Sequence, residues 1–175
     1  MFRCEAVGLE FLDSAPVPLR ATVTVNRPPD EVFAAFAHDP ATWGEFFPGF
    51  DRSGYYHTPA PHGVGSGYAK GFLGITIEQR VLAWEEGTRF AFRLERASFP
   101  VFRAWVEDYQ FEPDGANGTV VRVAMGAHPR LPVKLANLVL PRALPAALNR
   151  AGRNLESGQP LWDLPHGDLP RTTLT

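Results

Sequence analysis

The stretch RAWVEDYQF, beginning at Arg103, carries side chains that could act on an oxygen-bearing molecule. An arginine binds a carbonyl or carboxylate oxygen, and Glu107 or Tyr109 can pass a proton to or from a substrate beside it. Strict alternation puts these three residues and Trp105 on one side of a strand. Arg103 and Glu107 are then two pleats, about 13 Å, apart and do not pair directly. If this side faces inward, each charge needs a partner, water or a ligand, because an unpaired buried charge is costly.

A β-bulge near Val106, or a strand end that lets Arg103 reach solvent, explains the same stretch without any site. Both interpretations fit the sequence. We predict a hydrated polar patch around Arg103 and Glu107 in an otherwise apolar interior, and the bulge stays open as the alternative.

Three neighbouring segments also show an apolar face interrupted by one polar residue. The interruptions are Lys70, Gln79 and Arg96, and their apolar partners are, in the same order, Tyr68 with Phe72, Ile75 with Ile77 and Val81, and Phe90 with Phe92 and Leu94. Pockets for small molecules are commonly built in this way. A surface strand with a frayed end gives the same pattern, so each polar residue is either a pocket group or a solvated one.

The spacing of the residues does not support a nucleotide site, a metal site or a disulfide. The glycines of GVGSG at 63–67 precede a strand rather than a helix, so they do not form a pyrophosphate loop. His57 and His62 flank a turn with no third ligand, and the lone Cys4 makes neither an internal disulfide nor a cysteine zinc site. We expect no metal and no cofactor.

The composition is that of a globular domain. The chain has 175 residues, of which 45% are hydrophobic, 12% aromatic and 21% charged. A chain of this length buries roughly 70% of its unfolded surface, enough for a core that holds a cavity. The formal charge of −2 gives no attraction to phosphate backbones, so nucleic acid is not an expected partner.

Export and membrane insertion are not expected either. Glu5, Glu10 and Asp13 interrupt the first residues, where a secretory signal needs an unbroken apolar centre. The most apolar later run, residues 131–148, is broken by charged residues and prolines and lacks the roughly 20 apolar residues of a bilayer span. We therefore predict a cytoplasmic protein.

Hydrophobic periodicity predicts a mixed fold. Residues 21–26 alternate and predict a strand, after which two short helices begin near Asp30 and Asp39. Six further strands are predicted, at 51–58, 67–72, 76–84, 88–97, 101–112 and 119–127. Their short connections leave no room for helical crossovers, so about seven strands form an antiparallel sheet.

The last predicted element is a helix within residues 131–156. Leu140, Leu144 and Leu148 recur at helical spacing and form its apolar stripe. Because an interior proline costs about 3 kcal/mol, Pro141 and Pro145 predict a kink or a shorter helix that starts near Pro141.

Three parts of the chain follow from these elements. Residues 19–157 form the folded domain, and residues 158–175, which lack periodicity, predict an irregular tail. Residues 1–18 are an N-terminal extension, in which Val7, Leu9 and Phe11 alternate and predict a possible extra strand.

The order of elements resembles the START-like, or SRPBCC, superfamily over roughly residues 19–157. The resemblance is carried by VTVNRPPDEVFAAFAHDPATWGEFFPG, GVGSGY, ITIEQRVLAWEEGTRFAF and the Phe-Glu-Pro-x-Gly turn before TVVRVAM. It implies an α+β helix-grip fold, in which a curved antiparallel sheet of about seven strands, with two short helices after the first strand, wraps around a long C-terminal helix. It also implies an elongated cavity between sheet and helix, which in relatives holds lipids, polyketides or other apolar molecules.

On this resemblance the expected function is binding or transport of a hydrophobic or amphipathic small molecule. The residues expected to line the cavity are Trp43, Phe46, Phe47, Tyr68, Phe72, Ile77, Gln79, Phe90, Phe92, Trp105, Tyr109, Leu140, Leu144 and Leu148. An aromatase/cyclase-like enzyme is the alternative, with Arg103, Glu107 and Tyr109 as catalytic residues. A protein-interaction module of the co-chaperone kind is the third possibility.

The C-terminal helix is also basic. From residue 128 to 156 the chain has five basic residues (Arg130, Lys134, Arg142, Arg150 and Arg153) and one acidic residue. Such a helix either rests on an anionic membrane as a peripheral contact or simply has a solvated outer face. No feature of the sequence assigns an oligomeric state.

Overall fold

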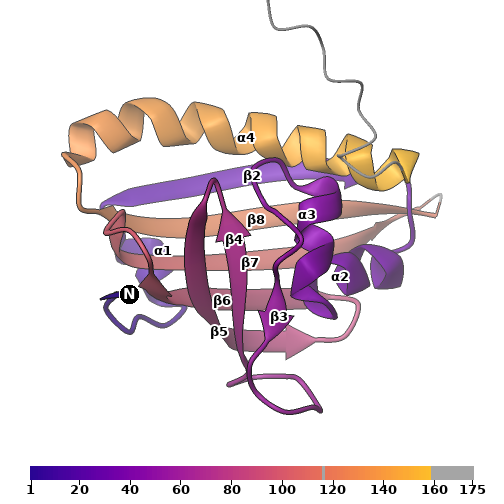
Figure 1. Ribbon diagram of the computed structural model, residues 1–175. Coiled ribbons are helices and arrows are strands. Elements are labelled where there is room, and N and C mark those ends of the chain that lie inside the picture. Colours follow the sequence, from indigo (N-terminus) through magenta and orange to yellow (C-terminus); the bar gives the residue numbers. More distant parts are fainter. Residues whose placement is uncertain (116, 159–175) are drawn as a thin grey trace, which may run out of the picture.

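A computed structural model of the chain describes residues 1–115 and 117–158, so the predicted irregular tail, except for its first residue Gly158, lies outside the described residues. Within them, one antiparallel sheet has α2, α3 and α4 on the face that we call inner (Figure 1). The opposite face is called outer.

The sheet of the described residues has eight strands. Seven follow the order β2-β8-β7-β6-β5-β4-β3, and the two-residue β1 pairs with β6. The strands are β1 Phe2–Arg3, β2 Val17–Val25, β3 Tyr55–Tyr56, β4 Gly67–Phe72, β5 Ile75–Glu85, β6 Arg89–Ala97, β7 Phe102–Asp114 and β8 Gly118–Pro129. The antiparallel sheet, the early short helices and the long final helix confirm the predicted helix-grip class.

Strand β7 settles the side to which RAWVEDYQF turns. Tyr109 and Phe111 contact Phe36 of α2 with ring centroids 5.0 and 5.5 Å apart, so the odd-numbered residues face inward. Glu107 is opposite Phe92 of β6 and belongs to the same face.

The inner face is closed at one end by helices α2 (Pro29–Ala37), η1 (Pro40–Thr42) and α3 (Trp43–Phe46). Pro29 begins α2 at a position where no backbone donor is lost, and Asp30 and Glu31 complement the dipole of the first turn. Phe33 and Phe36 of α2 are buried against the sheet. This end of the interior is therefore filled by aromatic side chains rather than by the C-terminal helix alone.

Helix α4 (Val133–Ser157) lies along the edge strand β2 (Figure 1). Leu148 is buried, whereas Leu140 and Leu144 are half-buried against the core. At the C-terminal end, a Cβ on Gly152 would lie 2.9 Å from Cγ2 of Val23, so glycine permits the close approach of helix and strand. Across the described helices, none combines the length and the apolar character of a transmembrane span.

The predicted start of this helix near Pro141 is wrong, because α4 runs through both prolines as one element of 25 residues. The carbonyls that lose an amide partner belong to Asn137 and Pro141, which are exposed, so water can satisfy them. Packing of the Leu148 face against β2 then outweighs the cost of the two prolines.

The N-terminal extension differs from the expected strand over residues 7–11. Its strand is β1, and residues Phe11–Ser14 form the single helical turn α1 on the outer face. A Cβ at Gly126 of β8 would lie 3.0 Å from Cβ of Ala15 and 3.1 Å from Cδ1 of Phe11. The extension thus covers the outer side of β7 and β8.

Candidate functional site

Trp43 is fixed in the core by the segment Asp39-Pro40-Ala41-Thr42. The carboxylate of Asp39 accepts a hydrogen bond of 2.9 Å from the Ala41 amide and starts the 3-10 turn. The indole Nε1 of Trp43 then donates to the carbonyl oxygen of Phe36 at 2.8 Å. The ring is 1% exposed and turns one face toward β4.

Lys70 of β4 points onto that face. Its Nζ lies 3.1 Å from the centroid of the Trp43 ring, and the rings of Phe50, Phe92 and Tyr68 are 4.7, 5.0 and 5.3 Å away. The residue is 1% exposed, and Nζ has no hydrogen-bond partner among the described residues. Unpartnered buried donors are rare in native proteins and call for an explanation.

Two effects compete over the charge of Lys70. Burial lowers the pKa of the amine well below its usual value, and the carboxyl of Glu107 works in the opposite direction. The surrounding ring faces also favour the ammonium form, because their quadrupoles attract a cation. Desolvation is the largest effect, so the amine is easier to deprotonate than an exposed lysine.

Glu107 of β7 holds the second charge of the interior. Its Oε2 accepts from the hydroxyl of Tyr109 at 2.5 Å, and its Oε1 accepts from Nε1 of Trp105 at 2.6 Å. Burial raises the pKa of Glu107, while the hydrogen bond from Tyr109, the charge of Lys70 and the hydrogen bond from Trp105 oppose the shift. Glu107 is therefore a carboxyl that can hold a proton more readily than an exposed glutamate.

Two further buried polar atoms lie beside Lys70 without a hydrogen-bond partner in the described part of the chain. They are the hydroxyl of Tyr68 and Oε1 of Gln79. Tyr68 and Gln79 are directly opposite each other on β4 and β5, and Lys70 is the next inward residue of β4. Burial also raises the pKa of Tyr68 well above its usual value, which keeps the hydroxyl protonated.

We call Lys70, Glu107, Tyr109, Tyr68 and Gln79 the inner polar cluster. It offers an amine, a carboxyl, two hydroxyls and an amide within an apolar surround. Such groups can bind an oxygen-bearing ligand and can move a proton at it.

The other residues predicted to line a cavity occupy two environments. One group is buried and closely packed in the aromatic end, and it contains Trp43, Phe46, Phe47, Phe90, Phe92 and Leu148. The second group is half-buried and contains Phe72, Ile77, Trp105, Leu140 and Leu144. Phe72 contacts the aromatic end through Phe50, with ring centroids 4.8 Å apart, whereas Trp105 of β7 and Leu140 and Leu144 of α4 form a more accessible end.

Trp105 connects these two ends. Its ring is half-buried and packs at a tilt of 50° against Phe102 with centroids 4.5 Å apart, while its indole N–H donates to Glu107. The N-terminal half of α4 lies at the same end, because Gly152 sits at Val23 and the helix runs along β2 toward Val17. From Gly152 back to Ala136 is about 24 Å of helix, which matches about 20 Å of strand from Val23 to Val17.

The prediction that Arg103 shares the interior with Glu107 is wrong. A register shift between Phe102 and Ala104 breaks the alternation, and Arg103 is exposed. This is the bulge alternative, displaced by a few residues toward the strand end. Arg103 therefore does not meet Glu107 and Tyr109.

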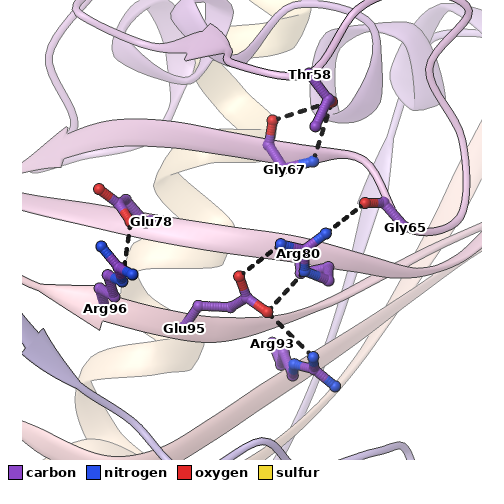
Figure 2. Close-up of polar contacts among 8 residues, drawn as sticks. All are labelled: Thr58, Gly65, Gly67, Glu78, Arg80, Arg93, Glu95 and Arg96. Atoms are coloured by element: carbon purple, nitrogen blue, oxygen red, sulfur yellow. Dashed lines mark hydrogen bonds and ion pairs between the residues drawn. The ribbon is translucent and has the colours of Figure 1, made fainter.

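Arg96 is a second correction. A bulge at Glu95 of β6 turns Arg96 to the outer face, where its Nε lies 3.7 Å from Oε2 of Glu78 (Figure 2). Lys70 and Gln79, the other two polar interruptions, do face inward. Lys70 carried a sequence signal, its position between Tyr68 and Phe72, yet only the fold showed that Trp43 covers it.

Two surface hollows are also present. One of about 220 Å³ lies at β1 and the outer face of β6, lined by Arg3, Cys4, Ala6, Arg93, Glu95 and Arg96. The other, of about 180 Å³, lies between α2–α3 and the C-terminal end of α4, and Phe46, Asn154 and Leu155 are among its lining residues. Neither hollow is lined by the inner polar cluster. In the described residues no group of three or more His, Cys, Asp or Glu side chains could hold a metal ion.

A curved antiparallel sheet with short helices and a long final helix around a buried polar cluster defines a START-like protein of the helix-grip class. The chain belongs to the family described as polyketide cyclase / dehydrase and lipid transport, which it matches over residues 17–157. The description of the family supports binding of hydrophobic small molecules in general and names no particular ligand for this chain.

Comparison with individual proteins agrees with this family. The uncharacterized protein Rv2574 of Mycobacterium tuberculosis is 32% identical over 158 residues, which cover 89% of this chain and 92% of that protein. A START superfamily protein from Mycobacterium smegmatis has a TM-score of 0.65 at 15% identity, over 81% of this chain and 96% of the other. TTHA0849 from Thermus thermophilus gives 0.59 at 14% identity, over 81% and 98%. The two structures support the fold alone.

Proposed function

We propose that the protein binds an amphipathic small molecule whose oxygen-bearing end reaches the inner polar cluster. The observation that carries the proposal is the amine of Lys70, buried against Trp43 with no hydrogen-bond partner among the described residues. A ligand oxygen that accepted from this amine would satisfy a group whose isolation costs stability.

The cluster favours some ligand ends over others. Lys70 offers only donors, the hydroxyl of Tyr68 can donate or accept, and Oε1 of Gln79 accepts. A carboxylate, a phenol or a carbonyl with a neighbouring hydroxyl fits this set. A ligand amine would meet the amine of Lys70 and is disfavoured by like charge.

The apolar part of the ligand is placed by the half-buried side chains. Trp105 and Ile77 supply incompletely covered apolar surface next to the cluster, and Leu140 and Leu144 supply more of it on α4. We infer that the ligand lies between the N-terminal half of α4 and this end of the inner face. Burial of a chain of eight methylenes there would contribute about 6 kcal/mol before the costs of association.

A panel of single-chain ligands that differ in their polar end tests the proposal. Decanoic acid, 4-octylphenol and decylamine are titrated while the fluorescence of the tryptophans and the melting temperature are followed. We expect the acid and the phenol to bind the wild type at least about tenfold more tightly than Lys70→Met, the value of one charge-assisted hydrogen bond. Native mass spectrometry of the purified protein should in addition show a co-purifying small molecule.

Arg80→Met is the matched control, since it removes a cation of β5 from the outer face. It should leave every affinity unchanged. The proposal fails if no member of the panel binds, if Lys70→Met binds the acid as well as the wild type does, or if decylamine is preferred.

A second candidate function is an aromatase/cyclase-like activity, and the raised pKa of Glu107 favours it. Glu107 would take a proton from a carbon next to a carbonyl, while Lys70 and Tyr109 would bind the developing oxyanion. With a poly-β-ketone substrate, Glu107→Gln should abolish turnover and leave binding within about threefold. Equal turnover by wild type and variant would exclude this function.

A further inference from the structure

The first two turns of α4 expose an apolar surface. Leu131, Leu135, Leu138 and Val139 are 60%, 51%, 58% and 52% exposed. They are four of the ten large hydrophobic side chains exposed in the described chain, and they fall within nine residues. Leu131 lies in the turn just before α4. We call these four residues the apolar patch.

The patch is not an unused part of the core stripe. At 100° per residue, Leu135, Leu138 and Val139 point away from the stripe of Leu140, Leu144 and Leu148. Because that stripe packs against the core, the patch lies on the opposite, exposed side of the helix. Only a partner outside the described residues can cover it.

The cations beside the patch differ from most arginines elsewhere in the chain because they have no carboxylate partner among the described residues. Eight arginines elsewhere have a carboxylate within 4.0 Å, namely Arg20, Arg27, Arg52, Arg80, Arg89, Arg93, Arg96 and Arg122. No basic residue between 130 and 153 has one among the described residues. Arg130 donates to the carbonyls of Phe102 and Arg3, and Arg142 donates to that of Leu138.

No acidic residue neutralises this segment along the sequence. The first acid after residue 129 is Glu156, whose carboxylate already accepts from the backbone amide of Asn26 at 2.8 Å. Lys134 and Arg142 flank the apolar patch, and Arg153 continues the same outward face toward the C-terminal end. The helix therefore presents leucine and valine side chains bordered by cations that have no carboxylate partner in the described part of the chain.

We propose that this face of α4 docks onto an anionic lipid bilayer. The four apolar side chains would enter the boundary between headgroups and acyl chains, and the unpaired cations would lie against lipid phosphates. A helix with this arrangement rests in the plane of the membrane surface and does not cross it. Docking does not depend on the nature of the ligand at the inner polar cluster.

Cosedimentation with vesicles tests the proposal on the full chain. The wild type should bind vesicles of phosphatidylcholine with about 30% phosphatidylglycerol, bind neutral vesicles at least about tenfold more weakly, and lose binding as salt is raised. The combined variant Leu135→Ser, Leu138→Ser, Val139→Ser should reduce partitioning roughly tenfold or more, since three exposed apolar groups are removed. Lys134→Gln with Arg142→Gln should reduce binding to anionic vesicles alone.

Matched controls exist for both changes. Val64→Ser with Phe99→Ser removes apolar side chains that are 69% and 61% exposed elsewhere. Arg20→Gln with Arg122→Gln removes two cations of the sheet. Neither pair should alter partitioning, and all variants should keep the circular dichroism of the wild type.

Three outcomes would overturn the proposal. The first is equal binding by the wild type and the triple serine variant, and the second is equal binding to neutral and anionic vesicles. The third is light scattering that shows a dimer which the triple variant turns into a monomer, because the patch would then be covered by a second copy of the chain.

Discussion

The inner and outer faces of the sheet differ in whether a buried or partly buried cation has a carboxylate partner. On the outer face, Glu95 accepts from Nε and Nη2 of Arg80 at 2.7 and 2.9 Å and from Arg93 at 3.1 Å (Figure 2). On the inner face, Lys70 has neither a hydrogen bond nor an ion pair among the described residues, although it is far more deeply buried.

This difference shows that the inner face contains a buried group that lowers the stability of the fold. The arginine–glutamate contacts at the outer face are partly solvated, and the hydrogen bonds of Arg80 lower the pKa of Glu95. Nε of Arg93 is buried without a hydrogen-bond partner in the described part of the chain, but Nη2 of the same guanidinium donates to Glu95. The amine of Lys70 has lost its water without gaining an acceptor. A fold that keeps such a group is arranged for something other than stability alone, and a binding site is the simplest reason.

The largest effect should come from removing the acceptor of the inner face. Glu107→Ala would leave the hydroxyl of Tyr109 and the indole N–H of Trp105 without their acceptor and would remove the charge that favours the ammonium form of Lys70. We expect a loss of about 3–5 kcal/mol in the free energy of unfolding, measured by urea denaturation. Glu112→Ala on the exposed end of β7 is the control and should cost less than about 1 kcal/mol.

Removing the amine should have the opposite sign. Lys70→Met keeps an unbranched side chain that is one heavy atom shorter and deletes the unpartnered donor, so the unfolding free energy should rise by about 1–3 kcal/mol. Arg80→Met on the outer face should lower it instead. A less stable Lys70→Met would mean that the aromatic rings stabilise the cation, and the contrast between the two faces would then be lost.

The same amine predicts a pH dependence. Because the pKa of Lys70 is lowered in the folded state, the unfolded chain binds more protons between that pKa and its ordinary value near 10.5. Stability of the wild type relative to Lys70→Met should therefore increase as the pH rises from about 7 to 9.5. Thermal denaturation at a series of pH values measures it, and parallel curves for the two proteins would contradict the assignment.

On the outer face, Glu95→Gln should have a modest effect. It removes the charge that Arg80 and Arg93 share but keeps an acceptor, and the glutamate side chain is 27% exposed. We expect a loss of about 1 kcal/mol in urea denaturation and no change in ligand affinity. A shift in affinity would show that the two faces are coupled through β5 and β6.

The smallest effect is expected for Arg103→Gln. The side chain is exposed beyond the register shift of β7, so stability should change by less than about 0.5 kcal/mol. Ligand affinity should also be unchanged. A clear loss of binding would place Arg103 near the ligand and reopen the sequence-based grouping of Arg103 with Glu107.

Most of the fold could be predicted from the sequence, because alternation and turn residues are local signals. The strand predicted at 67–72 is β4, and the one predicted at 88–97 differs from β6 by one residue. On β7, alternation grouped Glu107 with Tyr109 but left open which side faces inward, and it wrongly added Arg103 to the group. A register shift depends on the partner strand, so local alternation could not reveal it.

The sequence also could not predict that α4 is continuous through its two prolines, for a similar reason. Propensity gives the cost of Pro141 and Pro145, but the compensating contacts come from β2, more than a hundred residues earlier. Arg96 was likewise misplaced by a bulge in β6 that exists only through its pairing with β5.

By itself the sequence determined the antiparallel sheet, the amphipathic final helix and the candidate pair Glu107 and Tyr109, because these follow from periods of two and 3.6 residues. Only the tertiary structure decided that Lys70 lies under Trp43 and beside Glu107, since three separate segments must meet to bury one amine. Burial and pairing are properties of the assembled chain, and they turned a single polar interruption into the centre of the proposed site.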